Sequence, residues 1–215
     1  MRSKAKPTKN IRGEIEMTIL YTIDKSLYVN VTNACPCNCT FCVRLEHNSV
    51  GECDNLWLEH EPTLEEIIEA FKKQNLEAYD QVVFCGYGEP LVRLDIVLEV
   101  CKWIKAHSNR PIRINTNGLA NLIHQREIAY LLEGAVDAIS ISLNAPNKER
   151  YLEIARPCFG IDSFESLIQF AQACKKVIPR VTFSVVDVLS HEEIEACQRL
   201  ATDMNISLRV RERIK

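Results

Sequence analysis

The sequence predicts an α/β fold in which parallel strands alternate with helices in a single domain. Short apolar runs alternate with amphipathic helical patterns along the chain, without repeats or low-complexity linkers, and this alternation is typical of a parallel sheet. The length of 215 residues and the hydrophobic fraction of 47% suit one substantial core. The formal charge of -3 gives the molecule no general attraction to nucleic acid, so binding of that kind needs a local basic patch.

Six apolar runs predict strands, and four amphipathic patterns predict helices between them. The strands are expected at residues 27–31, 81–86, 111–116, 138–143, 181–186 and 206–211. The helices are expected after a capping-box pattern at Thr63 to Glu66, from Ile96 onward, and at residues 165–174 and 192–200. Periodicity does not separate an open partial barrel from a doubly wound sheet. In both architectures the chemistry sits at the carboxyl ends of the strands.

A cysteine-rich loop follows the first predicted strand and indicates a metal site. Residues 31–44 read V-T-N-A-C-P-C-N-C-T-F-C-V-R, which places Cys35, Cys39 and Cys42 in a C-x3-C-x2-C array. Three thiolates on a four-iron cluster leave one iron without a protein ligand, where chemistry can take place. A zinc site or a buried cysteine cluster are the alternatives. Cys37 lies inside the same loop and could act as a fourth ligand.

With Phe41 directly before the third cysteine, this array resembles the signature of the radical S-adenosylmethionine (radical SAM) superfamily. The resemblance implies one [4Fe-4S] cluster held by the outer three cysteines, with Cys37 as an uncoordinated neighbour. It also implies that the open iron is chelated by S-adenosylmethionine (SAM). The fold that it implies is a partial (β/α)6 TIM-type barrel, which decides between the two architectures.

The strings that end the later strands resemble further motifs of this superfamily. Gly86-Tyr87-Gly88-Glu89-Pro90 is similar to the glycine-glycine-glutamate motif that holds the amino group of SAM, although Tyr87 interrupts it. The polar residues that end the third and fourth strands resemble those that contact the SAM carboxylate and ribose. A simple glycine turn, or polar side chains satisfied by buried water, are the alternatives. The cofactor-binding residues implied are Phe41, Gly86, Gly88, Glu89, Asn115, Asn117, Ser140, Ser142 and Asn144.

Charged residues of the last two strands have two interpretations each. Arg209, Arg211 and Arg213 are expected to share one face of the last strand, where protection of a sheet edge is the default reading. The alternative is an anion-binding wall at the open side of the barrel. Asp187, after the fifth strand, is expected either to face the substrate or to take a structural role, as the cap of the helix that begins near Ser190 or in the turn before it.

The resemblance implies reductive cleavage of SAM to a 5′-deoxyadenosyl radical, which abstracts hydrogen from an unidentified substrate. Such an enzyme needs a reductant protein, such as flavodoxin or ferredoxin. The motif strings are most similar to the TatD-nuclease-associated branch, which links the protein to nucleic-acid or nucleotide metabolism by association alone. A glycyl-radical-enzyme activase, acting on a partner enzyme, is an alternative. A non-enzymatic iron–sulfur electron carrier is another. No catalytic residue is identified.

Composition predicts a cytoplasmic protein with no membrane partner. The chain has ten cysteines, its first residues lack the apolar segment of a signal peptide, and no apolar stretch is long enough to span a bilayer. A reducing compartment is therefore expected. Residues 1–16 are predicted to be a flexible basic tail and residues 17–215 the core domain, with translation starting at either Met1 or Met17.

Overall fold

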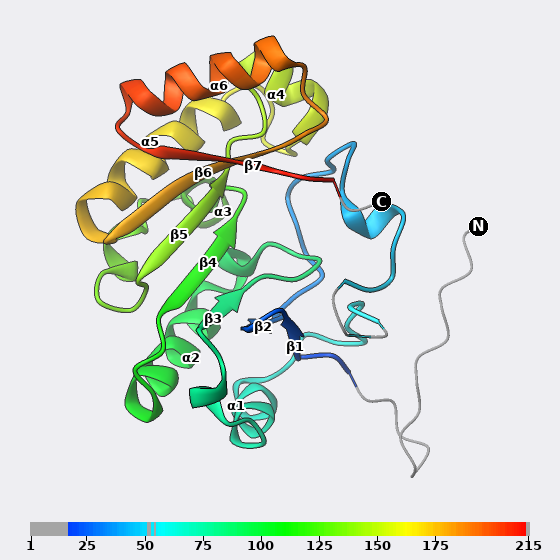
Figure 1. Cartoon of the computed structure of the whole chain (residues 1–215), viewed down its shortest axis with the longest axis vertical. Coiled ribbons are helices and arrows are strands. Elements are labelled where there is room, and N and C mark those ends of the chain that lie inside the picture. Colours follow the sequence, from blue (N-terminus) through cyan, green and yellow to red (C-terminus); the bar gives the residue numbers. More distant parts are fainter. Residues whose placement is uncertain (1–16, 51–52, 54, 214–215) are drawn as a thin grey trace.

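The computed structural model describes residues 17–50, 53 and 55–213, and these form one curved sheet with helices on its outer face (Figure 1). The seven strands follow one another in sequential order. They are β1 (Leu20–Ile23), β2 (Ser26–Val29), β3 (Gln81–Phe84), β4 (Ile112–Thr116), β5 (Ala138–Ser142), β6 (Arg180–Val186) and β7 (Ser207–Arg211). The predicted tail, residues 1–16, lies outside the described residues.

The strand order identifies the architecture as an open barrel. Strands β2 to β7 are parallel, and β1 pairs antiparallel with β2. A doubly wound sheet reverses its strand order at a switch point, whereas a barrel does not. Within the described residues β1 and β7 are the two free edges, so the barrel does not close. All six predicted strands and the partial barrel are confirmed, while β1 was not predicted.

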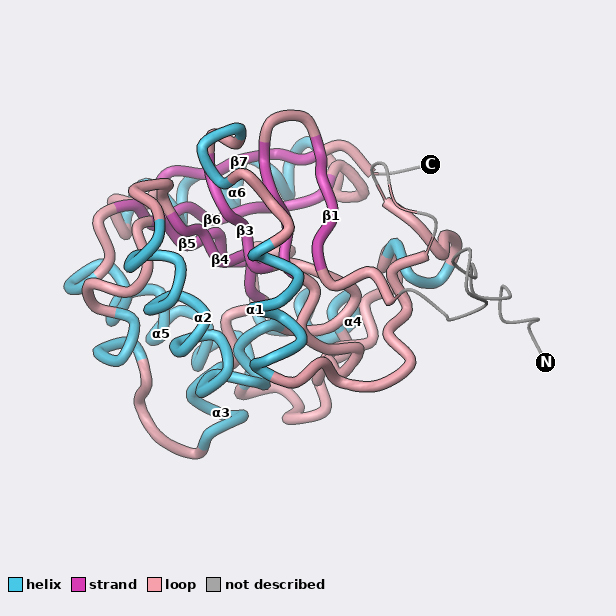
Figure 2. The backbone as a smooth tube through the Cα atoms, turned by 90° about the horizontal axis from the view of Figure 1, so that it is seen from below, coloured by secondary structure: helices cyan, strands magenta, loops and turns pink. Residues whose placement is uncertain are grey.

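Six α-helices in the described part of the chain cover the outer face of the sheet (Figures 1 and 2). The predicted capping box is present, because Thr63 Oγ1 accepts from Glu66 N and the Glu66 carboxylate accepts from Thr63 N. The helices are α1 (Leu64–Lys72), α2 (Leu94–His107), α3 (Ala120–His124), α4 (Lys148–Ala155), α5 (Ser163–Val177) and α6 (His191–Asp203). Helices α3 and α4 are additions to the predicted set.

The core lies between the sheet and these helices. Alternate residues of the strands, such as Ile139 and Ile141 in β5, are fully buried there. Ser140 and Ser142 point to the other face and are partly exposed. The polar inner face predicted from this alternation is therefore present, and a parallel strand that is polar on one face lines an interior space.

Candidate metal and cofactor site

The cysteine loop lies at the carboxyl end of β2 and is fixed on one side by the loop that follows β3. Gly88 N donates to Thr32 O at 3.0 Å, and Glu89 N donates to Ala34 O at 2.8 Å. The two motifs predicted from the sequence are thus hydrogen-bonded to each other through their backbones.

On its other side the cysteine loop contacts the end of α4. Asn38 N donates to Ala155 O at 3.1 Å, and Thr40 N donates to Ile154 O at 2.9 Å. An isolated antiparallel β-bridge between Cys37 and Pro157 continues this backbone pairing. The backbone of the loop is therefore held from both sides by protein hydrogen bonds.

The two glycines of the motif after β3 are explained by their contacts with this loop. A Cβ atom at Gly88 would lie 2.3 Å from Thr32 O, and one at Gly86 would lie 2.1 Å from Asn30 Oδ1. No side chain fits at such distances. The space is filled by the chain itself, so the glycines allow the two motifs to pack together. Their contact with SAM stays a prediction.

Tyr87, which interrupts the glycine motif, has a structural role. Its hydroxyl donates to His47 O at 2.6 Å, and its ring lies edge-on to Trp57 at a centroid distance of 5.0 Å. The ring is buried in a small cluster with Tyr21 and Leu56. The side chain of Tyr87, at the position where this sequence departs from the usual motif, therefore anchors the segment between the cysteine loop and α1.

The thiols of the loop differ in their surroundings. Cys35, Cys39 and Cys42 are half-buried, and Cys37 is buried. The Cys37 thiol donates to Cys35 and Cys39, which lowers the pKa of Cys35 to about 6 and also lowers the pKa of Cys39. Burial raises the pKa of Cys42. Thiolate is the form that binds metal, so Cys35 and Cys39 are prepared as ligands.

The donor set fits an iron–sulfur cluster. Within the described residues, no three His, Cys, Asp or Glu side chains are grouped as ligands of a metal ion. A cubane requires a different arrangement, because each cysteine ligates a separate iron. Three soft thiol donors on one short, backbone-anchored loop meet that requirement. That Cys35, Cys39 and Cys42 hold the cluster stays a prediction.

Arg44 stabilises the loop, and sequence analysis gave it no role. Its Nη2 donates to Cys37 O at 3.1 Å, and its Nη1 lies 3.5 Å from both Asn33 O and Tyr87 O. The guanidinium therefore links the cysteine loop to the loop after β3. Its positive charge also helps to lower the pKa of Cys35. The only signal in the sequence was a basic residue close to the third cysteine.

Glu89 is buried beside the cysteine loop, with 3% of its surface exposed. Its carboxylate accepts from Thr116 Oγ1 at 2.8 Å, Asn117 N at 2.6 Å and Leu91 N at 3.1 Å. Burial raises its pKa to about 7. A carboxylate offers about four acceptor positions, so a fourth donor such as an ammonium group can still be accommodated. Thr116, a partner from the end of β4, was not predicted.

The remaining predicted cofactor residues lie along the same rim or on the inner face. Asn117 Nδ2 lies 3.9 Å from Cys35 Sγ, and Asn115 contacts the Cys85 thiol. Asn144, with a left-handed φ of 59°, is buried, and its Oδ1 has no hydrogen-bond partner. An unpaired buried oxygen is suited to a ligand donor. Phe41 is partly buried against the core. Their contacts with SAM stay predictions.

The structure corrects two expectations about the charged residues near the end of the chain. Arg213 lies beyond β7 and does not share a face with Arg209 and Arg211; its Nη2 is 2.6 Å from Glu46 Oε1. Asp187 does not cap α6, because its carboxylate accepts from Arg213 N at 2.7 Å. Ser190 caps that helix through a capping box. Only the capping reading of Asp187 is wrong, because Ser190, directly before the helix, has the geometry for the capping position. Asp187 lies in the turn that follows β6.

The fold and the loop together define an open parallel barrel with a cysteine-rich loop, suited to an iron–sulfur cluster, at the carboxyl ends of its strands. The model of the Radical SAM superfamily matches residues 29–203. The chain therefore belongs to the radical SAM superfamily, whose members are enzymes that use a [4Fe-4S] cluster and SAM.

Several relatives match most of this chain. A GTP 3′,8-cyclase of Clostridium perfringens is 26% identical over 185 residues, covering 85% of this chain and 53% of the cyclase. A dual-specificity RNA methyltransferase RlmN of Prochlorococcus marinus is 27% identical over 187 residues, covering 81% of this chain and 49% of the methyltransferase. The chain thus spans about half the length of these relatives.

Solved structures support the fold. The structure described as "Native anSMEcpe with bound AdoMet" has a TM-score of 0.61 at 16% identity, covering 87% of this chain and 51% of that one. Methylornithine synthase has a TM-score of 0.61 at 14% identity, covering 88% of this chain and 53% of that one. At these identities the likeness concerns the fold alone.

Proposed function

We propose that this protein binds one [4Fe-4S] cluster through Cys35, Cys39 and Cys42 and cleaves SAM reductively, so that a 5′-deoxyadenosyl radical abstracts hydrogen from a substrate. The observation that carries the proposal is the hydrogen-bonded pairing of the cysteine loop with the segment that contains Gly88 and Glu89. This pairing brings the thiols and a buried carboxylate to one rim of the barrel.

The chain's own residues then bind and orient SAM. Glu89, partly charged near neutral pH, accepts from the SAM amino group; an ammonium neighbour favours its ionised form. Asn117, beside Cys35, and the unpaired Oδ1 of Asn144 are donors and acceptors for the carboxylate and ribose. The polar inner face, with Ser140 and Ser142, would offer hydroxyl groups to SAM, which when bound supplies the radical chemistry.

Anaerobic reconstitution with iron and sulfide, followed by SAM and dithionite, tests this function. Wild-type protein is expected to release 5′-deoxyadenosine and methionine, measured by liquid chromatography. Cys39→Ala is expected to release neither. Cys158→Ala is the matched control, because this exposed thiol lies near the loop without belonging to the array. Absence of 5′-deoxyadenosine from a wild-type protein that holds its cluster would refute the proposal and favour an electron carrier.

The narrower proposal concerns the branch and the partners. The similarity of the motif strings to the TatD-nuclease-associated branch supports a nucleotide or nucleic-acid substrate, and the names of the two relatives above refer to GTP and to RNA. A flavodoxin or ferredoxin is proposed as the reductant. All ten cysteines are free, in keeping with a cytoplasmic location. No helix in the described part of the chain is long and apolar enough to cross a membrane.

A further inference from the structure

Three arginines project from the inner face of the barrel. In a parallel sheet, residues paired across neighbouring strands point to the same side. Ser142 pairs with Ser184, and Ser184 pairs with Arg209, so Arg209 shares the face of the inner serines. Arg211, two residues on, does the same. Arg113 is on this face too, because it lies two residues before Asn115, the partner of Ser140.

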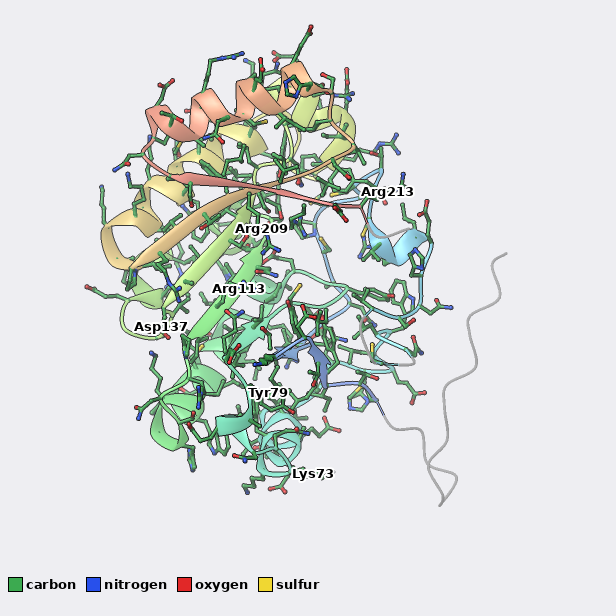
Figure 3. The ribbon with its side chains drawn as sticks, in the orientation of Figure 1. Lys73, Tyr79, Arg113, Asp137, Arg209 and Arg213 are labelled. Carbon is green, nitrogen blue, oxygen red and sulfur yellow. The ribbon has the colours of Figure 1, made fainter. Side chains whose placement is uncertain are left out.

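The three side chains gather near the ring of Tyr28. Arg113 Nη2 lies 3.5 Å from the Tyr28 hydroxyl. Burial raises the pKa of Tyr28, and the charges of both Arg113 and Arg209 act to lower it, which places both arginines near that ring. Figure 3 shows Arg113 and Arg209 in the region between β4 and β7, whereas Arg213 lies apart at the end of β7.

Among the described residues, none of these three arginines has an ion-pair partner, whereas Arg213 pairs with Glu46. The Nε atoms of Arg113 and Arg211 are buried without any hydrogen-bond partner. Burial lowers the pKa of Arg211, and the charge of Arg209 lowers it further. Arg209 is exposed. Three like charges close together, two of them with a buried unpaired Nε, are costly in isolation, and an anion removes that cost.

The position of the three arginines relates them to the proposed metal site. Arg211 is close enough to Cys39 and Cys85 for their charges to affect its pKa. Arg211, the last residue of β7, therefore lies near the rim that carries the cysteine loop, and Arg209 lies two residues before it in the same strand. A molecule anchored by them would extend toward that rim.

We propose that Arg113, Arg209 and Arg211 form the binding site for a phosphate group of the substrate. The inference rests on the proposed function for the reaction that follows binding, and it narrows the substrate to a small phosphate-bearing molecule. The planar guanidinium donates two parallel hydrogen bonds to phosphate oxygens. Three such groups match a phosphate with more than one negative charge better than a single carboxylate.

Titration calorimetry with inorganic pyrophosphate tests the site on the anaerobically reconstituted full chain with SAM bound. Arg209→Gln/Arg211→Gln is expected to bind pyrophosphate about a hundredfold more weakly than wild type, or about tenfold for each arginine. The matched control is Arg213→Gln, which removes the same charge from a residue outside the site and should bind as wild type does. SAM affinity and iron content should be unchanged in all three proteins.

Several results would overturn the proposal. These are equal pyrophosphate affinity in wild type and double variant, equal weakening in Arg213→Gln, or binding of the tricarboxylate tricarballylate but not of pyrophosphate. A parallel loss of SAM affinity would assign the arginines to the SAM carboxylate instead. Self-association of the double variant with unchanged pyrophosphate binding would assign them to edge protection.

If the double variant does not fold, the single variants Arg209→Gln and Arg211→Lys replace it. Binding is measured without turnover, so failure of SAM cleavage leaves this test intact.

Discussion

At the scale of single residues, Cys37 and Cys35 have adjacent thiols but different environments. Cys37 is 4% exposed, packs in the core and forms a backbone β-bridge with Pro157. Cys35, in contrast, is half-buried at the rim. We expect Cys35→Ala to lose the four-iron cluster, because alanine cannot replace a thiolate ligand. Cys37→Ala should keep it. Iron and sulfide content after anaerobic reconstitution measures both. Loss of the cluster in Cys37→Ala with retention in Cys35→Ala would reverse the ligand assignment.

The buried carboxylate of Glu89 predicts a pH dependence of stability. Its pKa is raised by burial to about 7, while the unfolded chain titrates near 4.5. The folded state therefore holds an extra proton between these values. The stabilisation of the folded state by this protonated Glu89 is fully present below about pH 4 and is lost as the pH rises through 7.

We expect the stability of Glu89→Gln relative to wild type to increase by up to about 3 kcal/mol between pH 4 and pH 8.5. Urea unfolding of the cluster-free proteins at several pH values measures this difference. A difference that stays constant with pH would show that Glu89 titrates normally.

Glu89 also predicts the affinity for SAM. A charge-assisted contact with the amino group contributes about 1.5–3 kcal/mol. Glu89→Gln should therefore weaken SAM binding roughly ten- to hundredfold, with iron content unchanged. Equilibrium dialysis of the reconstituted protein measures the dissociation constant. Glu77→Gln is a suitable control, because this exposed carboxylate pairs with Arg110 far from the loop in sequence. Unchanged affinity in Glu89→Gln would assign Glu89 to structure alone.

At the scale of elements, the contact between the cysteine loop and the loop after β3 depends on Gly88. An added methyl group would meet two backbone oxygens, Thr32 O at 2.3 Å and Ala34 O at 2.6 Å. The two loops must then separate, at a cost of about 1–3 kcal/mol. We expect Gly88→Ala to lower both the melting temperature and the uptake of iron. Gly134→Ala, where a Cβ meets no atom within 4 Å, should take up iron normally. Equal iron content in the two variants would contradict this account.

The elements that could be predicted are those whose signals are local. The six parallel strands are short segments rich in apolar residues, and the capping box at Thr63 lies within four residues. Strand β1 is only four residues long and is turned back by Asp24 at a left-handed φ of 52°, so it gave no alternation to recognise. Helix α4 is short and strongly polar.

The same distinction holds for the site. The three cysteines are close in sequence, so their chemistry is visible there. The contact of Thr116 with Glu89 joins residues 27 positions apart, and that of Arg44 with Tyr87 joins residues 43 apart. The position of Arg113 on the inner face likewise depends on strand register. Such contacts are set by the sheet, and the sequence alone does not specify them.

At the scale of the whole molecule, the anchoring of the cysteine loop predicts that folding precedes cluster binding. The loop is held by backbone hydrogen bonds to the segment after β3 and to the end of α4. Small zinc domains, in contrast, have no preformed site and unfold without metal. We expect the chelated protein to keep its far-UV circular dichroism and a cooperative unfolding transition. A large loss of helical signal on chelation, reversed by reconstitution, would contradict this expectation.

The end of β7 has a practical consequence for work with this protein. Arg213 is tied to Glu46 and Asp187, so the chain leaves the barrel beside the segment that follows the cysteine loop (Figure 1). An affinity tag or fused domain placed directly after Arg213 would therefore start beside Glu46, close to the cysteine loop in sequence. It would compete for the surface that an electron donor must approach, and a tagged protein could hold its cluster yet accept electrons slowly. Removing such a tag should precede any comparison of reductants.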